Sequence, residues 1–318
     1  MPTLPEPIDW AEFWGKDHTS EEWTIEPILP RGRQVAMYSP AKVGKSLLAL
    51  DVCARAATGR SVFGQVAGFP LTIVYLDLEM TETDLFERLD DMGYGPEADL
   101  SHFHYYLLPS LPPLDTKQGG AMLLEIVKRD LPDLVVIDTT SRVISGPEND
   151  ADTVRNLYQH TGMLLKQRGI TVWRLDHAGK DVNNGQRGTS AKNDDVDLVW
   201  QLSGQQTAFT LKATHRRQSW VPDVVHLVRE DMPFRHEIVQ QIWPSGTQNL
   251  VRLLEELDID QSLGAKTVRK LLREAGHGAR NETISAAIRW RKMQAGTLGD
   301  TSGTPSESAS GTPAGTPS

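Results

Sequence analysis

The sequence predicts an α/β protein: a mostly parallel, doubly wound sheet with an antiparallel extension, followed by a small helical unit. Three features point to this fold class. Between residues 34 and 175, short apolar runs alternate with helical stretches, as strands and crossover helices alternate in a parallel sheet. From residue 198 to residue 241, strand-like runs follow one another without helices. After residue 247 the pattern is helical only.

The apolar runs of the first part have the length of buried strands. The run from Leu71 to Asp77 is nearly continuously apolar, as expected where helices cover both faces of a sheet. Gly59 and Gly93 stand where two helices should end, because glycine adopts the left-handed conformation of a helix terminus. We expect strands near 34–38, 71–77, 103–108, 134–138 and 170–175, and helices near 46–58, 81–92, 119–129 and 150–167.

The later part should extend this sheet and then form a helical unit. The antiparallel strands are expected near 198–202, 208–214, 224–229 and 236–241, and the helices near 247–257, 266–275 and 282–293. Asn281 is a suitable N-cap for the last helix. The last two helices flank Gly276-His277-Gly278 and resemble a helix-turn-helix, so we expect a winged-helix-like unit.

Composition shifts divide the chain into four segments. Residues 1–33 form an arm whose tryptophans, Trp10, Trp14 and Trp23, would anchor it to its own domain or to a neighbouring subunit. Residues 34–243 form the sheet domain and residues 247–293 the helical unit. Residues 294–318 repeat Gly-Thr-Pro without aromatic or basic residues, which predicts a disordered tail.

The composition narrows the class of protein. The 318 residues carry a net charge of −9 and one cysteine, so a disulfide framework is excluded and a reducing cytoplasm is expected. No apolar run approaches the ~18 residues of a membrane-spanning helix, so no membrane partner is expected. Charge is uneven, because residues 266–292 hold eight Lys or Arg against two Glu. The global charge therefore hides a basic patch.

A phosphate-binding motif lies between the first expected strand and helix. Gly44-Lys45-Ser46 follows a β-branched strand and opens an apolar helix, the setting in which backbone N–H groups and a helix N-terminus bind phosphates. Lys45 would reach the β- and γ-phosphates and the Ser46 hydroxyl would ligate Mg²⁺. Ser39 replaces the usual first glycine, so a positive φ there would be strained. The expected nucleotide-binding residues are Ser39, Pro40, Ala41, Lys42, Val43, Gly44, Lys45, Ser46, Leu47 and Asp138.

Two carboxylates end neighbouring strands. Asp138 ends an apolar strand, where a carboxylate holds Mg²⁺ through water; a turn aspartate is the alternative. The next residue is Thr139 rather than Glu, so the base that activates water must come from elsewhere. Glu79 is the natural choice, since its carboxylate can accept a hydrogen bond from the attacking water. The alternative is that Glu79 only complements the dipole of the helix that Thr81 opens.

Over roughly residues 25–240 these motifs resemble the RecA-like ATPases, and in particular the RepA-type hexameric replicative helicases with their phage and bacterial AAA-family relatives. The resemblance implies a ring, ATP and Mg²⁺ as ligands, and a base on the strand next to the phosphate loop, as Glu79 would be. Leu175-Asp176-His177-Ala178-Gly179-Lys180 is similar to the family's strand that ends in His-x-x-Lys, which implies that His177 senses the γ-phosphate. Taken alone, His177 would be a capping histidine.

Further likenesses concern nucleic acid and the neighbouring subunit. Gln186 to Ala191 looks like the family's Arg-Gly-Ser-Ser-Ala segment, so Arg187, with Lys180 and Lys192, would meet a phosphate backbone unless the loop is merely solvated. Relatives carry a Lys-x-Arg finger where this chain has His215-Arg216-Arg217. The match is partial. Arg217 is the expected finger and Arg216 the reserve, with a basic hairpin turn as the alternative.

The expected function is a ring-forming, Mg·ATP-hydrolysing ATPase, a hexameric DNA helicase or translocase in replication or recombination. The basic C-terminal helices would bind DNA, or else a protein partner or the ATPase ring. An ATP-dependent switch or loader, which assembles on DNA without unwinding it, is the rival. A small-molecule kinase lacks support because no arginine-rich lid follows the loop. A scaffold that binds nucleotide without hydrolysis would be unaffected by Glu79→Gln.

Overall fold

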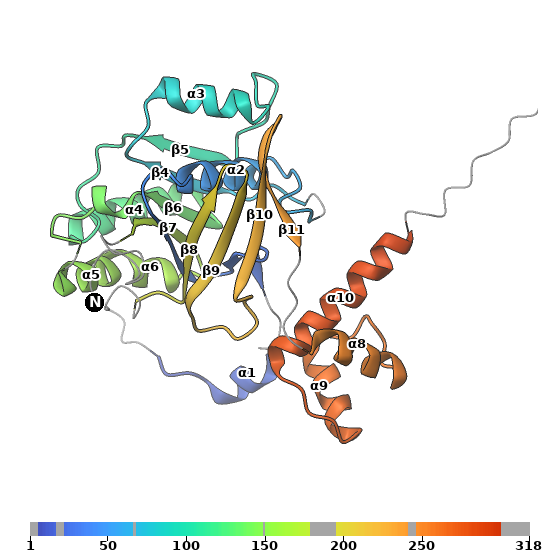
Figure 1. Cartoon of the computed structure of the whole chain (residues 1–318). Helices are drawn as coiled ribbons and strands as arrows, with labels where there is room; N and C mark the ends of the chain where they lie inside the picture. The colour runs from blue at the N-terminus through green and yellow to red at the C-terminus, as the bar shows by residue number, and fades with distance from the viewer. Residues whose placement is uncertain are drawn as a thin grey trace, which may run out of the picture. The chain divides into compact units, whose positions relative to one another are not determined.

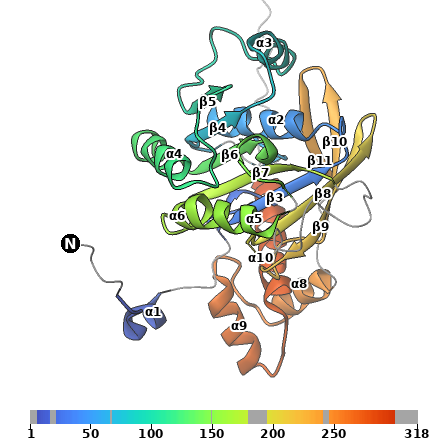
Figure 2. The same ribbon diagram turned by 90° about the vertical axis from the view of Figure 1, so that its left-hand side faces the viewer.

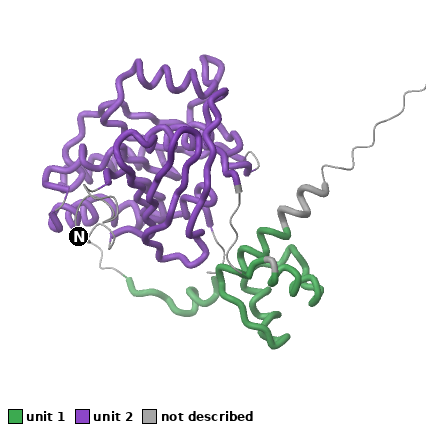
Figure 3. Tube along the Cα trace, in the orientation of Figure 1, with its two compact units in different colours: residues 1–20, 245–318 green, residues 21–244 purple. Residues whose placement is uncertain are grey.

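The computed structural model describes residues 6–16, 22–65, 68–148, 150–178, 195–240 and 246–299. Two compact units make up the chain: residues 21–244, and residues 1–20 together with residues 245–318 (Figure 3). The boundary of the larger unit therefore falls near residue 21, whereas the sequence placed the end of the arm at residue 33. No helix in these described ranges is long and apolar enough to cross a membrane.

The larger unit is built on one sheet, which has nine strands within the described residues (Figure 1). The strand order is β11-β10-β9-β8-β3-β7-β6-β4-β5. From β8 to β5 every adjacent pair runs parallel, which confirms the mostly parallel sheet. The parallel strands are β3 (Gln34–Ser39), β4 (Ile73–Asp77), β5 (Phe103–Leu107), β6 (Leu134–Asp138), β7 (Thr171–His177) and β8 (Leu198–Gln205).

The antiparallel extension begins at β8. This strand pairs parallel with β3 on one side and antiparallel with β9 on the other. The three further strands are β9 (Ala208–Arg216), β10 (Val224–Asp231) and β11 (Phe234–Gln240). The strand β3, which leads into the phosphate loop, therefore lies inside the sheet, with β7, β6, β4 and β5 on one side and β8, followed by the antiparallel strands, on the other.

Helices cover both faces of the parallel part (Figure 1 and Figure 2). Alternate residues of β4 show this directly: Ile73 and Tyr75 pack in one apolar cluster with α2, and Val74 and Leu76 in another with α4. Such alternation follows from the two-residue period of a strand. The helices are α2 (Lys45–Ala57), α3 (Glu82–Asp91), α4 (Lys117–Asp130), α5 (Ala151–Leu157) and α6 (Met163–Lys166).

The helix expected from residue 150 to residue 167 contains a π-helical turn, Tyr158–Gly162, between α5 and α6. This turn lies very close to α4. A Cβ atom added to Gly120 would stand 1.9 Å from the carbonyl oxygen of His160, so only glycine fits there. The apolar period alone did not show this wider turn, because a π turn shifts the helix face by one residue without changing its composition.

The segment before β3 packs on the larger unit. Strands β1 (Trp23–Ile25) and β2 (Leu29–Pro30) form a small antiparallel pair, and Trp23 stacks edge-on against Trp220 with centroids 4.6 Å apart. The indole of Trp200 donates to the carbonyl of Ile28 at 2.9 Å. By contrast, Trp10 and Trp14 lie in the short helix α1 (Trp10–Gly15) and are 62% and 71% exposed.

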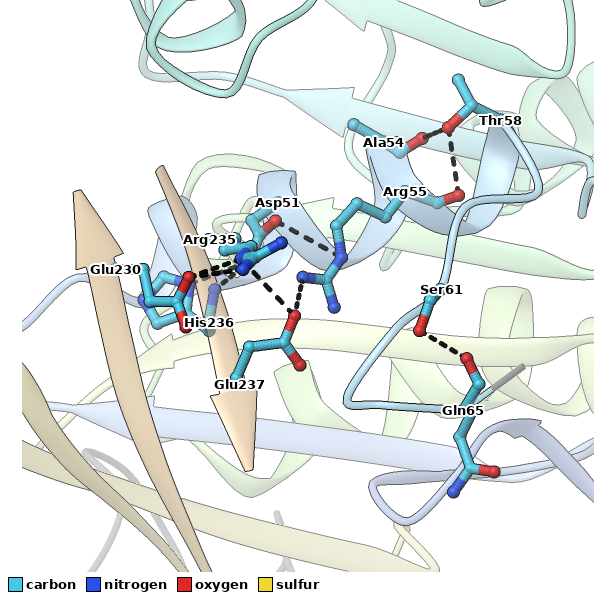
Figure 4. Close-up of polar contacts among 10 residues, drawn as sticks. All are labelled: Asp51, Ala54, Arg55, Thr58, Ser61, Gln65, Glu230, Arg235, His236 and Glu237. Atoms are coloured by element: carbon cyan, nitrogen blue, oxygen red, sulfur yellow. Dashed lines mark hydrogen bonds and ion pairs between the residues drawn. The ribbon is translucent and has the colours of Figure 1, made fainter. Parts of the chain in front are cut away.

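A buried charged cluster joins α2 to the edge strand β11 (Figure 4). The carboxylate of Asp51 accepts a hydrogen bond from the backbone N–H of His236 at 2.6 Å, and its other oxygen lies 3.7 Å from Nε of Arg55. The Arg55 guanidinium donates to Glu237 at 2.7 Å. Asp51, Arg55 and His236 are all buried, so these contacts fix α2 against the antiparallel end of the sheet.

The described part of the smaller unit contains the expected helices, α8 (Thr247–Glu256), α9 (Ala265–Glu274) and α10 (Asn281–Gly299). Leu254, Val268, Leu272 and Ile284 form its apolar core. Helices alone are present in that part, so the winged-helix-like expectation is not confirmed. The last helix runs past its expected end at residue 293; residues 300–318 of the predicted disordered tail lie outside the described residues.

Candidate nucleotide-binding site

The phosphate loop connects β3 to α2. Gly44 is the N-cap residue of α2, with φ of 106°, and Lys42 also has a positive φ of 64°. Within the described residues no side chain caps this helix end, so its first N–H groups are available to an anion. Ser39 is the buried last residue of β3 and has no positive φ, so the condition under which a serine there would be strained does not arise. The positions with positive φ lie later in the loop.

Lys45 faces three carboxylates. Its side chain is largely buried, and this burial lowers the pKa of the ammonium group, while Asp138, Glu79 and Asp176 act in the opposite direction. The carboxylates come from the ends of three different strands or the turns that follow them. Two of these carboxylates also have an arginine nearby: Nε of Arg174 lies 3.2 Å from Asp176, and Nε of Arg142 lies 3.8 Å from Glu79.

Asp138, the last residue of β6, is held by two donors. The hydroxyl of Ser46 donates to Oδ1 at 3.1 Å and the phenol of Tyr75 donates to Oδ2 at 2.8 Å. Burial raises the pKa of this carboxyl to about 6, against the lowering effect of both hydrogen bonds. Ser46 and Asp138, each expected to hold Mg²⁺, are thus in direct contact in the structure.

Glu79 follows β4 and lies at the same edge of the sheet. One carboxylate oxygen accepts from the Thr139 hydroxyl at 3.2 Å, and lies 3.8 Å from Nε of Arg142 and 3.8 Å from Nε2 of His177. Along the chain β4 is the next strand after β3, but β7 and β6 lie between them in the sheet. The expectation of a strand next to the phosphate loop therefore holds only in chain order.

His177 ends β7 and is paired in register with Ser39. It therefore lies between the phosphate loop and Glu79, where a side chain that senses the γ-phosphate is expected. The segment that should relay its state, with Lys180, Arg187 and Lys192, lies outside the described residues. Its contact with nucleic acid stays a prediction.

Arg216 and Arg217 lie at the opposite edge of the sheet. Arg216 is paired with Leu198, the first residue of β8, and the guanidinium of Arg217 lies 3.5 Å from Asp197. Asp197 in turn accepts from the backbone N–H of Gln34, where β3 begins, so roughly 16 Å of strand separates this end from the phosphate loop. Arg217 does not join the other site residues of its own chain. Its role as a finger for a neighbour stays a prediction.

Some residues of the site were not found by the sequence reasoning. Asp77 accepts from the backbone N–H groups of Glu79 and Met80 at 2.8 and 3.1 Å and so shapes the turn that carries Glu79. The Tyr75 hydroxyl donates to Asp138, and the Tyr105 hydroxyl donates to Asp77. For Tyr75 the available signal was a tyrosine inside an otherwise aliphatic apolar run, since a buried phenol usually has a hydrogen-bond partner.

The donor set fits Mg²⁺ bound together with a nucleotide. Ser46 and Asp138 offer adjacent oxygen atoms, the ligand type that Mg²⁺ prefers. In the described ranges no group of three or more His, Cys, Asp or Glu side chains gathers as a closed metal cage. Mg²⁺ commonly keeps its waters and binds through one or two protein oxygens plus phosphates, so the open arrangement is the fitting one.

A phosphate loop between strand and helix, and an aspartate ending a buried strand beside it, define a P-loop ATPase, and the sheet order with its antiparallel extension makes it RecA-like. The family described as the AAA domain matches residues 3–183, and the chain belongs to that family. No curated protein matches the chain.

Among solved structures, the fold is similar to that of a KaiC-like protein from the hyperthermophilic archaeon Pyrococcus horikoshii OT3. The TM-score is 0.50 and the identity 14%, over 70% of this chain and 97% of the other. At this identity the likeness concerns the fold alone.

Proposed function

We propose that the chain hydrolyses Mg·ATP as a ring-forming motor on nucleic acid, a DNA helicase or translocase of the RepA type. The observation that carries the proposal is the meeting of Lys45, Asp138, Glu79 and His177 at one edge of the sheet. Each of these residues comes from a different strand end or from the phosphate loop, so the fold itself assembles the set.

Each residue would have one task. Lys45 and the N-terminus of α2 bind the phosphates, while Ser46 and Asp138 hold Mg²⁺, which screens the charge that develops on the γ-phosphate. Glu79 accepts a hydrogen bond from the attacking water, a contribution of roughly 10²–10⁴-fold for a positioned base. His177, 3.8 Å from Glu79, would report whether the γ-phosphate is present.

The ring part of the proposal is supported by the position of Arg217. Its side chain is 48% exposed and lies at the edge opposite to the phosphate loop of its own chain. A guanidinium there can stabilise transferred phosphate only in another copy. Such a group typically contributes about 10³–10⁵-fold to turnover, so hydrolysis would depend on assembly. A hexamer is the proposed ring.

Nucleic acid is proposed as the track because the smaller unit carries exposed cationic side chains. Lys266, Lys270, Arg273 and Arg280 are exposed on α9 and before α10. Contacts of this kind position a phosphate backbone without reading its sequence. Together with the proposed loop of Lys180, Arg187 and Lys192, they would hold the strand.

The test is ATP turnover with and without single-stranded DNA, at several protein concentrations. Wild type is compared with Glu79→Gln and Arg217→Ala, and with Glu82→Gln as a control, because Glu82 is exposed on the same segment. We expect turnover to rise with DNA and with concentration, a loss of ~10²-fold or more in the first two variants, and no change in the control.

Other outcomes decide against parts of the proposal. If turnover ignores DNA and concentration, or Arg217→Ala has wild-type turnover, the ring motor is rejected. DNA-dependent assembly with slow turnover and no separation of a forked duplex would favour the ATP-dependent switch or loader. Wild-type turnover in Glu79→Gln would remove Glu79 as the base.

A further inference from the structure

Two stacked tyrosines lie beneath the candidate site. Tyr75 of β4 and Tyr105 of β5 are paired in register, with ring centroids 4.9 Å apart and planes 15° from parallel. Phe103 packs edge-on against both rings. Tyr75 is fully buried, and Phe103 is buried as well. The apolar contacts of the rings would be the same with phenylalanine at either position, so the two hydroxyl groups need their own explanation.

The hydroxyl groups bond to two different carboxylates. Tyr75 donates to Oδ2 of Asp138 at 2.8 Å, and Tyr105 donates to Oδ2 of Asp77. Asp77 and Asp138 are the paired last residues of β4 and β6, and both are buried. Each tyrosine therefore holds one of two adjacent buried carboxylates by a single oxygen.

What the other oxygen does differs between the two carboxylates. In Asp138 the other oxygen, Oδ1, accepts a hydrogen bond from the Ser46 hydroxyl at 3.1 Å, and the cation is expected beside these two groups. In Asp77, Oδ1 accepts the backbone N–H groups of Glu79 and Met80 and so sets the turn that carries Glu79. Asp138 therefore lies where the cation is expected, whereas Asp77 supports Glu79, which is proposed to bind the attacking water.

Both phenols keep their protons at neutral pH. A phenol ordinarily loses its proton only near pH ~10, and an ionised carboxylate has no proton to donate, so the phenol is the donor in each contact. Each hydroxyl is therefore a permanent donor. A carboxylate with one oxygen tied to a fixed donor has a defined rotation, which is how outer-shell partners orient metal ligands.

We propose that the stacked pair positions the two ends of the nucleotide site separately: Tyr75 orients Asp138 toward the cation, and Tyr105, through Asp77, orients Glu79 toward the attacking water. Both are positioning residues, since neither touches the nucleotide. The inference rests on the proposed Mg·ATP hydrolysis and names two residues on which it depends.

The first test measures binding rather than turnover. The affinity of the full chain for ADP is determined by calorimetry with excess Mg²⁺ and again with EDTA. In Tyr75→Phe we expect the gain in affinity from Mg²⁺ to fall by about 10-fold, as for loss of an outer-shell partner of a metal ligand, while affinity in EDTA stays at the wild-type value. Tyr105→Phe should keep the full gain.

The second test measures turnover at saturating Mg·ATP. Tyr105→Phe should lower kcat by about 10-fold or more with unchanged KM, because a small displacement of a catalytic group is costly. Tyr106→Phe is the matched control. This residue is the next one on β5, but its hydroxyl donates to Asp130, at the end of α4, and both readouts should remain at wild-type values.

The two experiments test whether Tyr75 and Tyr105 have separate roles. If both variants change both readouts equally, the rings have only a general structural role and the proposal is overturned; it is also overturned if neither readout changes. Should Tyr75→Phe not fold, Tyr105→Phe alone decides, because unchanged kcat there refutes the pathway through Asp77. No ATP turnover in wild type, or no effect of Mg²⁺ on its affinity for ADP, would instead refute the proposed Mg·ATP hydrolysis itself. Unchanged turnover in Glu79→Gln would remove Glu79 as the base and, with it, the role proposed for Tyr105.

Discussion

Replacing Asp51 with alanine should destabilise the larger unit strongly. The side chain is 1% exposed and joins α2 to β11 through the backbone N–H and the ring Nδ1 of His236, at 2.6 and 3.1 Å. Without it, the backbone N–H of His236 loses its acceptor, and Arg55, 6% exposed, loses one of its two carboxylate partners among the described residues and keeps Glu237. Because α2 begins with Lys45 and Ser46, a loosened helix would also weaken nucleotide binding.

The magnitude follows from the burial of these groups. Removing one partner of a buried ion pair typically costs about 3–5 kcal/mol, because the remaining charge is left in a poorly polarisable surrounding. Leaving a buried N–H without an acceptor costs about 1–3 kcal/mol. Glu237 compensates part of the charge on Arg55 and the two costs overlap, so we expect a loss of about 3–4 kcal/mol.

Urea unfolding followed by tryptophan fluorescence measures this loss. Trp173 and Trp200 are fully buried in the larger unit and report on it. The control is Asp152→Ala, which removes an ion pair with Arg155 whose side chains are 75% and 69% exposed, and which should cost under about 1 kcal/mol. A loss below about 1 kcal/mol in Asp51→Ala would refute the reasoning, since the buried cluster would then contribute no more than an exposed pair.

Two further predictions address the other parts of the molecule. Gly120→Ala should lower the thermal midpoint by an amount equivalent to about 1–3 kcal/mol, because the added carbon would meet the carbonyl of His160 at 1.9 Å; an unchanged midpoint would contradict the close approach of α4 to the π turn. Replacing Lys270 and Arg273 together with alanine should reduce the slope of log affinity for single-stranded DNA against log salt by about 1.4, and an unchanged slope would exclude these side chains from the contact.

The sequence predicted the order of strands and helices and the edge at which the site forms. Both predictions rest on local rules that the structure obeys. A continuous apolar run such as 134–138 can be buried on both faces only in a covered sheet, and parallel strands bring their carboxyl ends to one edge. Asp138, Glu79 and His177 each followed such a run, so their meeting near Lys45 was predictable.

What the sequence could not give are properties that depend on neighbours across space. The order of strands in the sheet differs from their order along the chain, so the sequence did not show that β7 and β6 lie between β3 and β4. The hydroxyl groups of Tyr75 and Tyr105 bond to carboxylates on adjacent strands, and these contacts can be recognised only once the strand order is known. The sequence also did not show that the left-handed residues of the loop are Lys42 and Gly44 and do not include Ser39.

The placement of the phosphate loop and Arg217 at different ends of a strand has a consequence for any assembly that uses both. The two features lie at the two ends of β3, one beside Ser39 and the other near Gln34. If copies join head to tail, the interface is heterologous, and repeating it closes a ring or continues as a helical filament. In a ring or filament each subunit is a donor on one side and a recipient on the other, so an assembly that does not close retains one incomplete site at its end. In a two-fold dimer the two copies would instead complete each other's sites, and no site would remain incomplete.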